Sequence, residues 1–174
     1  MTNTVDISTY NNIYVTSDWH LSHKNILKYD ENRKFDSVDD MNEYIISTVE
    51  STIKKWDLMI FLWDLTLWNV NNVDLMMNRL SNFDKIWVLW NHDSKDSIKK
   101  LSKHFILVLD TLIIWDKIHF NHFAPLDFKD NVNYQVDKYD KYIHWHTHKP
   151  KKHWYWYDIS FDWIKLLYNL NELL

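Results

Sequence analysis

The sequence predicts an α/β protein with two packed mixed β-sheets flanked by helices, formed by one domain that spans residues 1–174. In the first half, short apolar segments alternate with segments of helical periodicity, which is the pattern of an α/β fold. After about residue 105, strand-like segments follow one another with short connections. Hydrophobic residues make up 46% and charged residues 25%, so the chain has the composition of a folded globular protein.

The first elements follow from local patterns. Residues 12–17 (NIYVTS) are rich in β-branched residues and predict a strand. Ser37 followed by Asp40 is a capping-box-like start, and apolar residues then recur at three- and four-residue steps, which predicts an amphipathic helix up to Ile53. Residues 58–62 are a short, continuously apolar run, typical of a strand buried on both faces.

The same reasoning continues along the chain. Apolar spacing predicts a helix through residues 73–80, a strand at 86–89 and a third helical stretch marked by Ile98, Leu101 and Phe105. The remaining segments are interpreted as strands. They are residues 105–109, 112–115, 117–122, 142–144, 157–161 and 164–168.

Composition and charge exclude several classes of protein. The formal net charge is −4, so a broad basic surface for nucleic acid is not expected. Cysteine is absent, which excludes disulfides and thiolate metal sites. The first residues lack the basic start and apolar stretch of a signal peptide, and no apolar run reaches the ~18–20 residues of a membrane span. The sequence therefore predicts a cytoplasmic protein without a membrane partner.

The glycine and tryptophan contents are unusual. An average usage of roughly 7% would give about 12 glycines in a chain of this length. The sequence contains 0 glycines and 11 tryptophans. An A/T-rich gene would deplete both residues, so codon bias does not explain the surplus of tryptophan.

Clusters of Asp, Asn and His follow the predicted strands. Because ligands collect at the carboxyl ends of strands in α/β sheets, these clusters are candidates for one shared site. Such oxygen and imidazole donors suit Mn²⁺, Fe or Zn²⁺, and also Ni²⁺ or Co²⁺. The clusters are Asp18-Trp19-His20, Asp64, Asn91-His92-Asp93, His122 and the run from His144 to His148.

Each motif alone has a plainer interpretation. A single D-x-H is a weak signal, N-H-D is common in turns, and histidines near lysines are often exposed surface residues. What favours a metal site is the order of the clusters and their shared position after strands. The other histidines are better explained as structural or solvent-exposed: His23, His104, His119 and His153.

With these motifs, the sequence resembles the calcineurin-like metallophosphoesterase superfamily. The signature of that superfamily runs D-x-H, G-D, G-N-H-D/E, a lone H and G-H-x-H. The tail DISFDWIKLLYNLNEL is also similar to the closing strands of small members. The corresponding blocks here, in order, are SDWHLSH at 17–23, LWDLTLW at 62–68, WNHD at 90–93, NHFAPL at 121–126 and HWHTH at 144–148.

The resemblance implies a metallophosphoesterase-type sandwich with two divalent ions, Mn²⁺ first among the candidates. One ion would be held by Asp18, His20, Asp64 and His148, and the second by Asp64, Asn91, His122 and His146. The implied reaction is hydrolysis of a phosphate ester by a hydroxide that bridges the ions. His92 would contact the phosphate and protonate the leaving oxygen, Asp93 would orient His92, and Asn91 would also contact substrate. Arg33 and His23 are further candidates for binding the phosphate.

The sequence departs from the superfamily at its glycines. Trp63, Trp90 and Trp145 occupy the glycine positions of the motifs, and Trp56, Trp68 and Trp115 lie where a glycine turn is natural. Only Trp19 and Trp87 lie where a large side chain is readily accepted. Since UGA encodes tryptophan in some genetic codes and glycine in others, we hypothesise that most of these tryptophans are glycines in the living organism.

The substrate class is less sharply defined than the site. The G-D block continues as LTLW and lacks the acidic and arginine residues of the protein serine/threonine phosphatase branch. A nucleotide or another small phosphate mono- or diester is therefore the expected substrate. Two alternatives are a Mn²⁺-dependent nuclease acting on DNA or RNA, which the acidic charge disfavours, and a non-catalytic interaction scaffold, which would be expected to have lost ligands.

Overall fold

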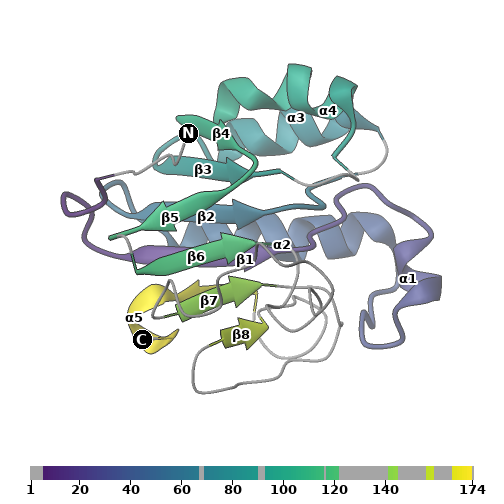
Figure 1. Ribbon diagram of the computed structural model, residues 1–174. Coiled ribbons are helices and arrows are strands. Elements are labelled where there is room, and N and C mark those ends of the chain that lie inside the picture. Colours follow the sequence, from purple (N-terminus) through teal and green to yellow (C-terminus); the bar gives the residue numbers. More distant parts are fainter. Residues whose placement is uncertain are drawn as a thin grey trace.

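The computed structural model of the protein describes residues 6–66, 69–89, 93–115, 117–121, 141–144, 156–158 and 166–173. The described chain forms two β-sheets with helices packed beside them (Figure 1). Within these residues, no helix is both long enough and apolar enough to cross a membrane.

The larger sheet has five strands in the order β4-β3-β2-β1-β9. Strands β1 to β4 run parallel, and β9 pairs antiparallel with β1, so the sheet is mixed. The strands are β1 (Ile13–Ser17), β2 (Leu58–Leu62), β3 (Asp84–Val88), β4 (Leu107–Leu109) and β9 (Tyr168–Asn169).

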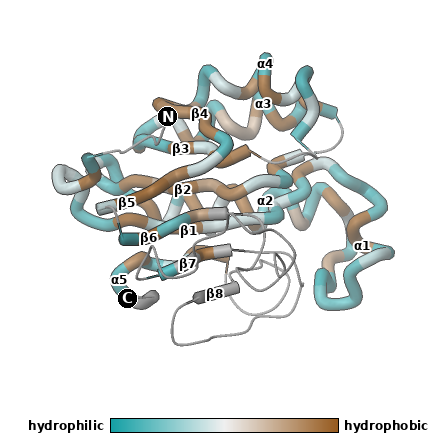
Figure 2. The backbone as a smooth tube through the Cα atoms, viewed as in Figure 1, coloured by the Kyte–Doolittle hydropathy of each residue, from teal (hydrophilic) through white to brown (hydrophobic). Residues whose placement is uncertain are grey.

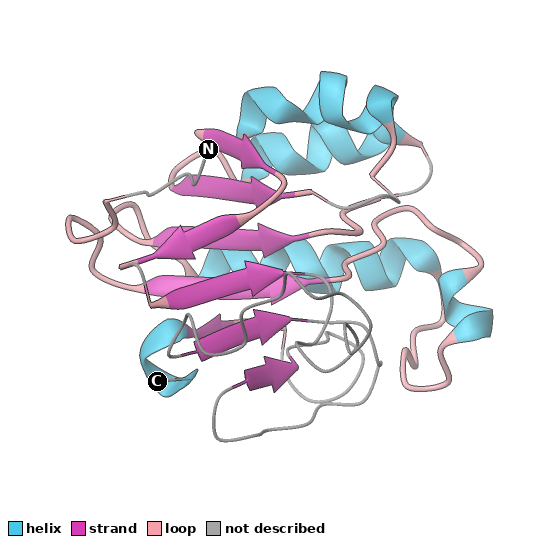
Figure 3. Cartoon of the chain, viewed as in Figure 1, coloured by secondary structure: helices cyan, strands magenta, loops and turns pink. Residues whose placement is uncertain are grey.

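The smaller sheet has four strands in the order β5-β6-β7-β8. Strands β5 and β6 form an antiparallel hairpin, and β6, β7 and β8 run parallel. Figure 3 shows the arrowheads of β2, β3, β6, β7 and β8 on the same side of the molecule. The strands are β5 (Leu112–Ile114), β6 (Ile118–Asn121), β7 (Lys141–His144) and β8 (Trp156–Asp158).

Helices connect the parallel strands of the larger sheet. The longest, α2, begins after Ser37, whose hydroxyl accepts the backbone N–H of Asp40 at 3.1 Å. The predicted cap of this helix is thereby confirmed. The helices are α1 (Ile26–Tyr29), α2 (Val38–Thr52), α3 (Val70–Arg79), α4 (Lys95–Leu101) with the 3₁₀ turn η1 (Ser102–His104), and α5 (Leu170–Leu173).

Two apolar cores lie on opposite faces of the larger sheet. Alternate residues of β2 point to opposite faces, as the period of a strand requires. Met59 and Phe61 join the core beneath α2 and α3, whereas Ile60 joins a core shared with Phe120 and Ile143 of the smaller sheet. The fully buried β2 explains why its sequence is continuously apolar. In Figure 2, β2 is hydrophobic along its length, whereas α3 alternates between hydrophobic and hydrophilic residues.

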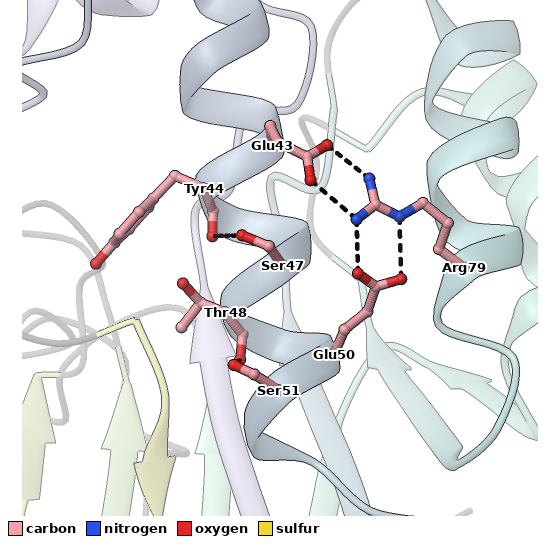
Figure 4. A network of polar contacts seen from close by, with 7 residues as sticks. All are labelled: Glu43, Tyr44, Ser47, Thr48, Glu50, Ser51 and Arg79. Carbon is pink, nitrogen blue, oxygen red and sulfur yellow. Dashed lines mark hydrogen bonds and ion pairs between the residues drawn. The ribbon is translucent and has the colours of Figure 1, made fainter.

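An ion-pair network joins α2 to α3 on the surface (Figure 4). Arg79 of α3 forms paired hydrogen bonds to Glu43 at 2.6 and 3.0 Å and to Glu50 at 3.0 and 2.6 Å. These bonds lower the pKa of Glu43 below its usual value. The guanidinium geometry suits two carboxylates at once, so this contact links two helices whose inner faces form the core.

The predicted elements are largely confirmed, and the differences lie at their ends. Trp115 was expected to end a strand and also to lie at a natural glycine turn. It lies in the turn between β5 and β6, where the Lys117 N–H donates to the Ile114 carbonyl at 3.0 Å. Phe105 was expected to belong to a helix and a strand, and it lies between η1 and β4. The short helices α1 and α5 were not predicted. Predicted strand residues 122, 159–161 and 164–165 lie outside the described residues.

Candidate metal centre

Three of the predicted ligands meet in a buried cluster. Asp18, His20 and Asp64 each offer one ligand atom, and these atoms lie within 4.8 Å of one another. Asp18 is fully buried, and His20 and Asp64 are 6% and 4% exposed. Because residues 18 and 64 come from separate parts of the chain, their meeting is a property of the fold.

The register of the sheet explains this meeting. Ser17 at the end of β1 is paired with Leu62 at the end of β2. Beyond these residues the backbones remain joined: the Asp18 N–H donates to the Trp63 carbonyl at 3.3 Å, and the His20 N–H donates to the Asp64 carbonyl at 3.0 Å. The two loops therefore leave the sheet together, with their polar side chains at the carboxyl ends of parallel strands.

The backbone at the cluster is left-handed at most of its positions. Asp18, His20, Ser22 and Asp64 have φ angles of 57°, 49°, 62° and 53°. A residue other than glycine in this region costs on the order of 1–3 kcal/mol and persists only where the surroundings hold it. Such concentrated strain is characteristic of functional sites, and it separates these loops from the regular strands that precede them.

Trp63 shares this conformation, with a φ of 33°. Its N–H donates to the Val88 carbonyl at 2.9 Å, so the residue joins the ends of β1, β2 and β3. Its indole is completely buried in the core between the sheets. Asp and His tolerate a positive φ comparatively well, but for a bulky residue it is a genuine outlier.

Arg33 lies against the backbone of residues 18–20, named the metal loop here because they carry the candidate ligands Asp18 and His20. Its Nη2 donates to the Asp18 carbonyl at 2.5 Å, its Nη1 to the Trp19 carbonyl at 3.1 Å, and its Nε to Asp30 Oδ2 at 3.1 Å. The residue is 4% exposed. The phosphate contact suggested by the sequence stays a prediction; the partners seen here are protein oxygens and the Met41 Sδ at 3.6 Å.

His23 and Asp93 both lie buried, at 8% and 7% exposure. The ring of His23 is 5.7 Å from that of His20, centroid to centroid, so this candidate is adjacent to the cluster. Burial, together with the charge of Arg33, lowers the pKa of His23 below its usual value. Asp93 directly precedes Ser94, whose hydroxyl caps α4.

The other predicted site residues lie outside the described residues. These are Asn91, His92, His122, His146 and His148. Their neighbours along the chain are described: β3 ends at Val88, β6 at Asn121 and β7 at His144. The predicted second set of ligands therefore stays a prediction.

Several supporting residues were not identified from the sequence. Asn42 of α2 accepts the Ser22 N–H at 3.0 Å, and the Thr66 hydroxyl donates to the Leu21 carbonyl at 2.8 Å. Asp30 pairs with the guanidinium that holds the loop. Asn42 is 1% exposed and Thr66 is fully buried. A polar residue on the apolar face of a predicted helix, as Asn42 is, was the available signal.

The cluster consists of two carboxylates and an imidazole, which are donors suited to Mn²⁺, Fe or Zn²⁺. Two buried carboxylates at this separation repel one another when ionised, and a divalent cation between them offsets that repulsion. The donor set therefore fits one divalent ion.

Comparisons with known proteins support the fold and leave the chemistry open. No family model matches the chain. A solved structure from Aquifex aeolicus, described as the protein of unknown function AQ665, has a TM-score of 0.73 at 20% identity and covers 98% of both chains. Its likeness shows that this arrangement of mixed sheets and helices exists as an experimental fold.

One curated relative is similar over part of its length. Uncharacterized protein MJ1445 of Methanocaldococcus jannaschii is 35% identical over 82 residues. The match covers 47% of this chain and 46% of that protein, so the chain spans about half the length of this relative.

Proposed function

We propose that this protein is a metal-dependent phosphoesterase that hydrolyses small phosphate mono- or diesters, with nucleotides among the candidate substrates. The observation that carries the proposal is the buried cluster of Asp18, His20 and Asp64 at the carboxyl ends of two parallel strands. These are the residues of the D-x-H and G-D blocks by which the sequence resembles metallophosphoesterases.

The remaining blocks support a second ion. His122 directly follows β6, His146 and His148 closely follow β7, and Asn91 closely follows β3. Strands β3, β6 and β7 point to the same side of the molecule as β2 (Figure 3). Asp64 would serve both ions, because a carboxylate offers two oxygens.

Different residues would bind the ions, hold the substrate phosphate and deliver the proton. When bound, two divalent ions supply positive charge to the phosphoryl oxygens and activate a water for attack. Asp18, His20, Asp64 and His148 would hold one ion, and Asp64, Asn91, His122 and His146 the other. His92 would hold the substrate phosphate and deliver a proton to the leaving oxygen, and Asp93 would orient its ring.

The decisive experiment compares two aspartates at opposite ends of β2. Asp64→Asn removes a carboxylate charge from the cluster. Asp57→Asn is the matched control: Asp57 is also buried, but it accepts hydrogen bonds from Asn12 Nδ2 and the Lys54 N–H, both at 2.8 Å, at the amino end of the strand.

With Mn²⁺ and bis-p-nitrophenyl phosphate, Asp64→Asn is expected to lower turnover at least about 100-fold, because it removes charge from the ion site. Asp57→Asn is expected to lower stability and leave turnover per folded molecule unchanged. Retained turnover in Asp64→Asn would refute the proposed site. A parallel panel of nucleotides, single-stranded DNA and RNA distinguishes a small-ester hydrolase from a nuclease.

A further inference from the structure

We infer that Arg33 is the positioning residue of the metal loop: its guanidinium, paired with Asp30, fixes the left-handed backbone that aims Asp18 and His20 at the ion. This inference rests on the proposed function, since it assigns a role in the same site. It differs from phosphate binding, the role that the sequence suggested for Arg33.

The contacts of Arg33 carry the inference. The Asp18 carbonyl accepts a hydrogen bond from Nη2 and the Trp19 carbonyl accepts one from Nη1. The guanidinium therefore bridges the two peptide groups between the candidate ligands Asp18 and His20. A planar fork with fixed donors sets the angle between two adjacent carbonyls in a way that a flexible ammonium does not. The orientation of the loop is therefore coupled to the guanidinium.

Asp30 completes the arrangement. Its Oδ2 accepts the Arg33 Nε at 3.1 Å, and the side chain of Asp30 is only 12% exposed. A buried guanidinium is costly unless a carboxylate compensates its charge. Asp30 thus keeps the cation in place behind the loop through Nε, while Nη1 and Nη2 reach the two carbonyls.

Arg79 provides a matched control. Arg33 and Arg79 are the two arginines of the sequence. Both form ion pairs, but Arg79 is 38% exposed and joins α2 to α3 through Glu43 and Glu50. Lysine at either position keeps the positive charge and loses the planar guanidinium with its paired donors. The two substitutions therefore differ only in where they lie in the fold.

The experiment titrates the full-length protein with Mn²⁺, followed by electron paramagnetic resonance, and records thermal unfolding without metal. Arg33→Lys is expected to weaken Mn²⁺ binding about 10–100-fold, the usual range for a residue that orients ligands. Arg79→Lys is expected to lower the melting temperature and leave the Mn²⁺ affinity unchanged. A merely structural Arg33 would affect the melting temperature alone.

The outcomes separate the two proposals. Wild-type affinity in folded Arg33→Lys would overturn this inference and leave the proposed function standing, as would an equal loss in Arg79→Lys. Wild-type protein that binds no Mn²⁺ would overturn the proposed function itself. If Arg33→Lys does not fold, Asp30→Asn takes its place, because it keeps the guanidinium and removes its counter-charge. Unchanged affinity in that variant would also overturn the inference.

Backbone geometry carries a second and independent inference, which needs no metal site. We propose that residues 63 and 115 are glycine in the protein that the source organism makes, encoded by UGA. Among the described tryptophans, these two have positive φ angles, 33° at Trp63 and 54° at Trp115. Glycine adopts such angles without steric cost, whereas bulky residues rarely do.

Two other tryptophans, Trp19 and Trp87, are packed as large aromatic side chains of a core usually are. Trp19 is fully buried, stacks edge-on against Phe61 at 4.9 Å and donates its indole N–H to Thr16 Oγ1 at 2.8 Å. Trp87 is a fully buried residue of β3 that packs against Phe105 at 5.1 Å. At residues 19, 63, 87 and 115 the backbone agrees with the motifs of the sequence, whereas Trp56, which the sequence placed at a natural glycine turn, does not have a positive φ.

Gene sequencing and peptide mass spectrometry of the protein from its natural source test this inference. Codons 63 and 115 are expected to be TGA, with glycine in the corresponding peptides, while codons 19 and 87 are expected to be TGG. A TGG codon at 63 or 115 would overturn the inference. Tryptophan in the natural peptides at these positions would overturn it equally.

Discussion

At residue 115, glycine is expected to be more stabilising than alanine, and at residue 56 the order should reverse. Trp115 has a φ of 54° and begins the turn between β5 and β6. Trp56 lies in the turn before β2 and does not have a positive φ. Both side chains are exposed, at 46% and 63%, so either can be removed without emptying a core.

The expected magnitudes follow from the backbone alone. The left-handed conformation costs a residue with a Cβ roughly 1–2 kcal/mol, while glycine loses about 0.5–1 kcal/mol more chain entropy on folding than alanine. Trp115→Gly should therefore exceed Trp115→Ala in stability by about 0.5–1 kcal/mol. Trp56→Gly should be less stable than Trp56→Ala by about the same amount.

Thermal or urea unfolding of the four variants measures these differences. In a protein of this size, 1 kcal/mol corresponds to about 2–4 °C in melting temperature. Each comparison joins two variants that have both lost the indole, so loss of side-chain packing cancels. The same order of glycine and alanine at both positions would refute the assignment of backbone strain to residue 115.

Three further predictions concern stability. Phe61→Ala is expected to cost about 3–5 kcal/mol in urea unfolding, because Phe61 is fully buried against Trp19; a loss below 1 kcal/mol would contradict this packing. Arg79→Ala should lower the melting temperature at low salt and lower it less at 1 M NaCl, where charges are screened within about 3 Å; a salt-independent loss would exclude an ion-pair origin. Burial lowers the pKa of Lys85 to about 8. Between pH 8 and 10, Lys85 therefore binds more protons in the unfolded chain than in the folded protein, and the free energy of unfolding should rise with pH. Above pH 10 that trend should weaken, because burial raises the pKa of Tyr10 to about 12, and Lys85→Met should abolish the rise.

The elements that the sequence predicted well are those with long, regular patterns. The apolar run of β2 and the periodicity of α2 each reflect many residues that bury one face. Helix α1 has four residues and no side-chain cap, so neither periodicity nor capping indicated it. Trp115 had two interpretations in the sequence, the end of a strand and a natural glycine turn, and the structure confirms the turn.

The candidate site was predictable only in part. Asp18, His20 and Asp64 are recognisable from residue type and position after strands, because the ends of parallel strands converge. The support of the loop was not predictable in the same way. Arg33 acts through backbone carbonyls, and no pattern of side chains in the sequence indicates which carbonyls a buried guanidinium reaches.

The antiparallel pairing of β9 with β1 has a consequence for synthesis on the ribosome. The Thr16 hydroxyl donates to the Leu166 carbonyl at 2.7 Å, across 150 positions of the sequence. At about 5–20 residues per second, translation needs roughly 8–30 s to cover that interval. During this time β1 has a bare edge on one side, and an unprotected edge can recruit other nascent chains. Residues 166–169 therefore cover this edge of β1, and the edge stays open to pairing with other chains until they have been synthesised.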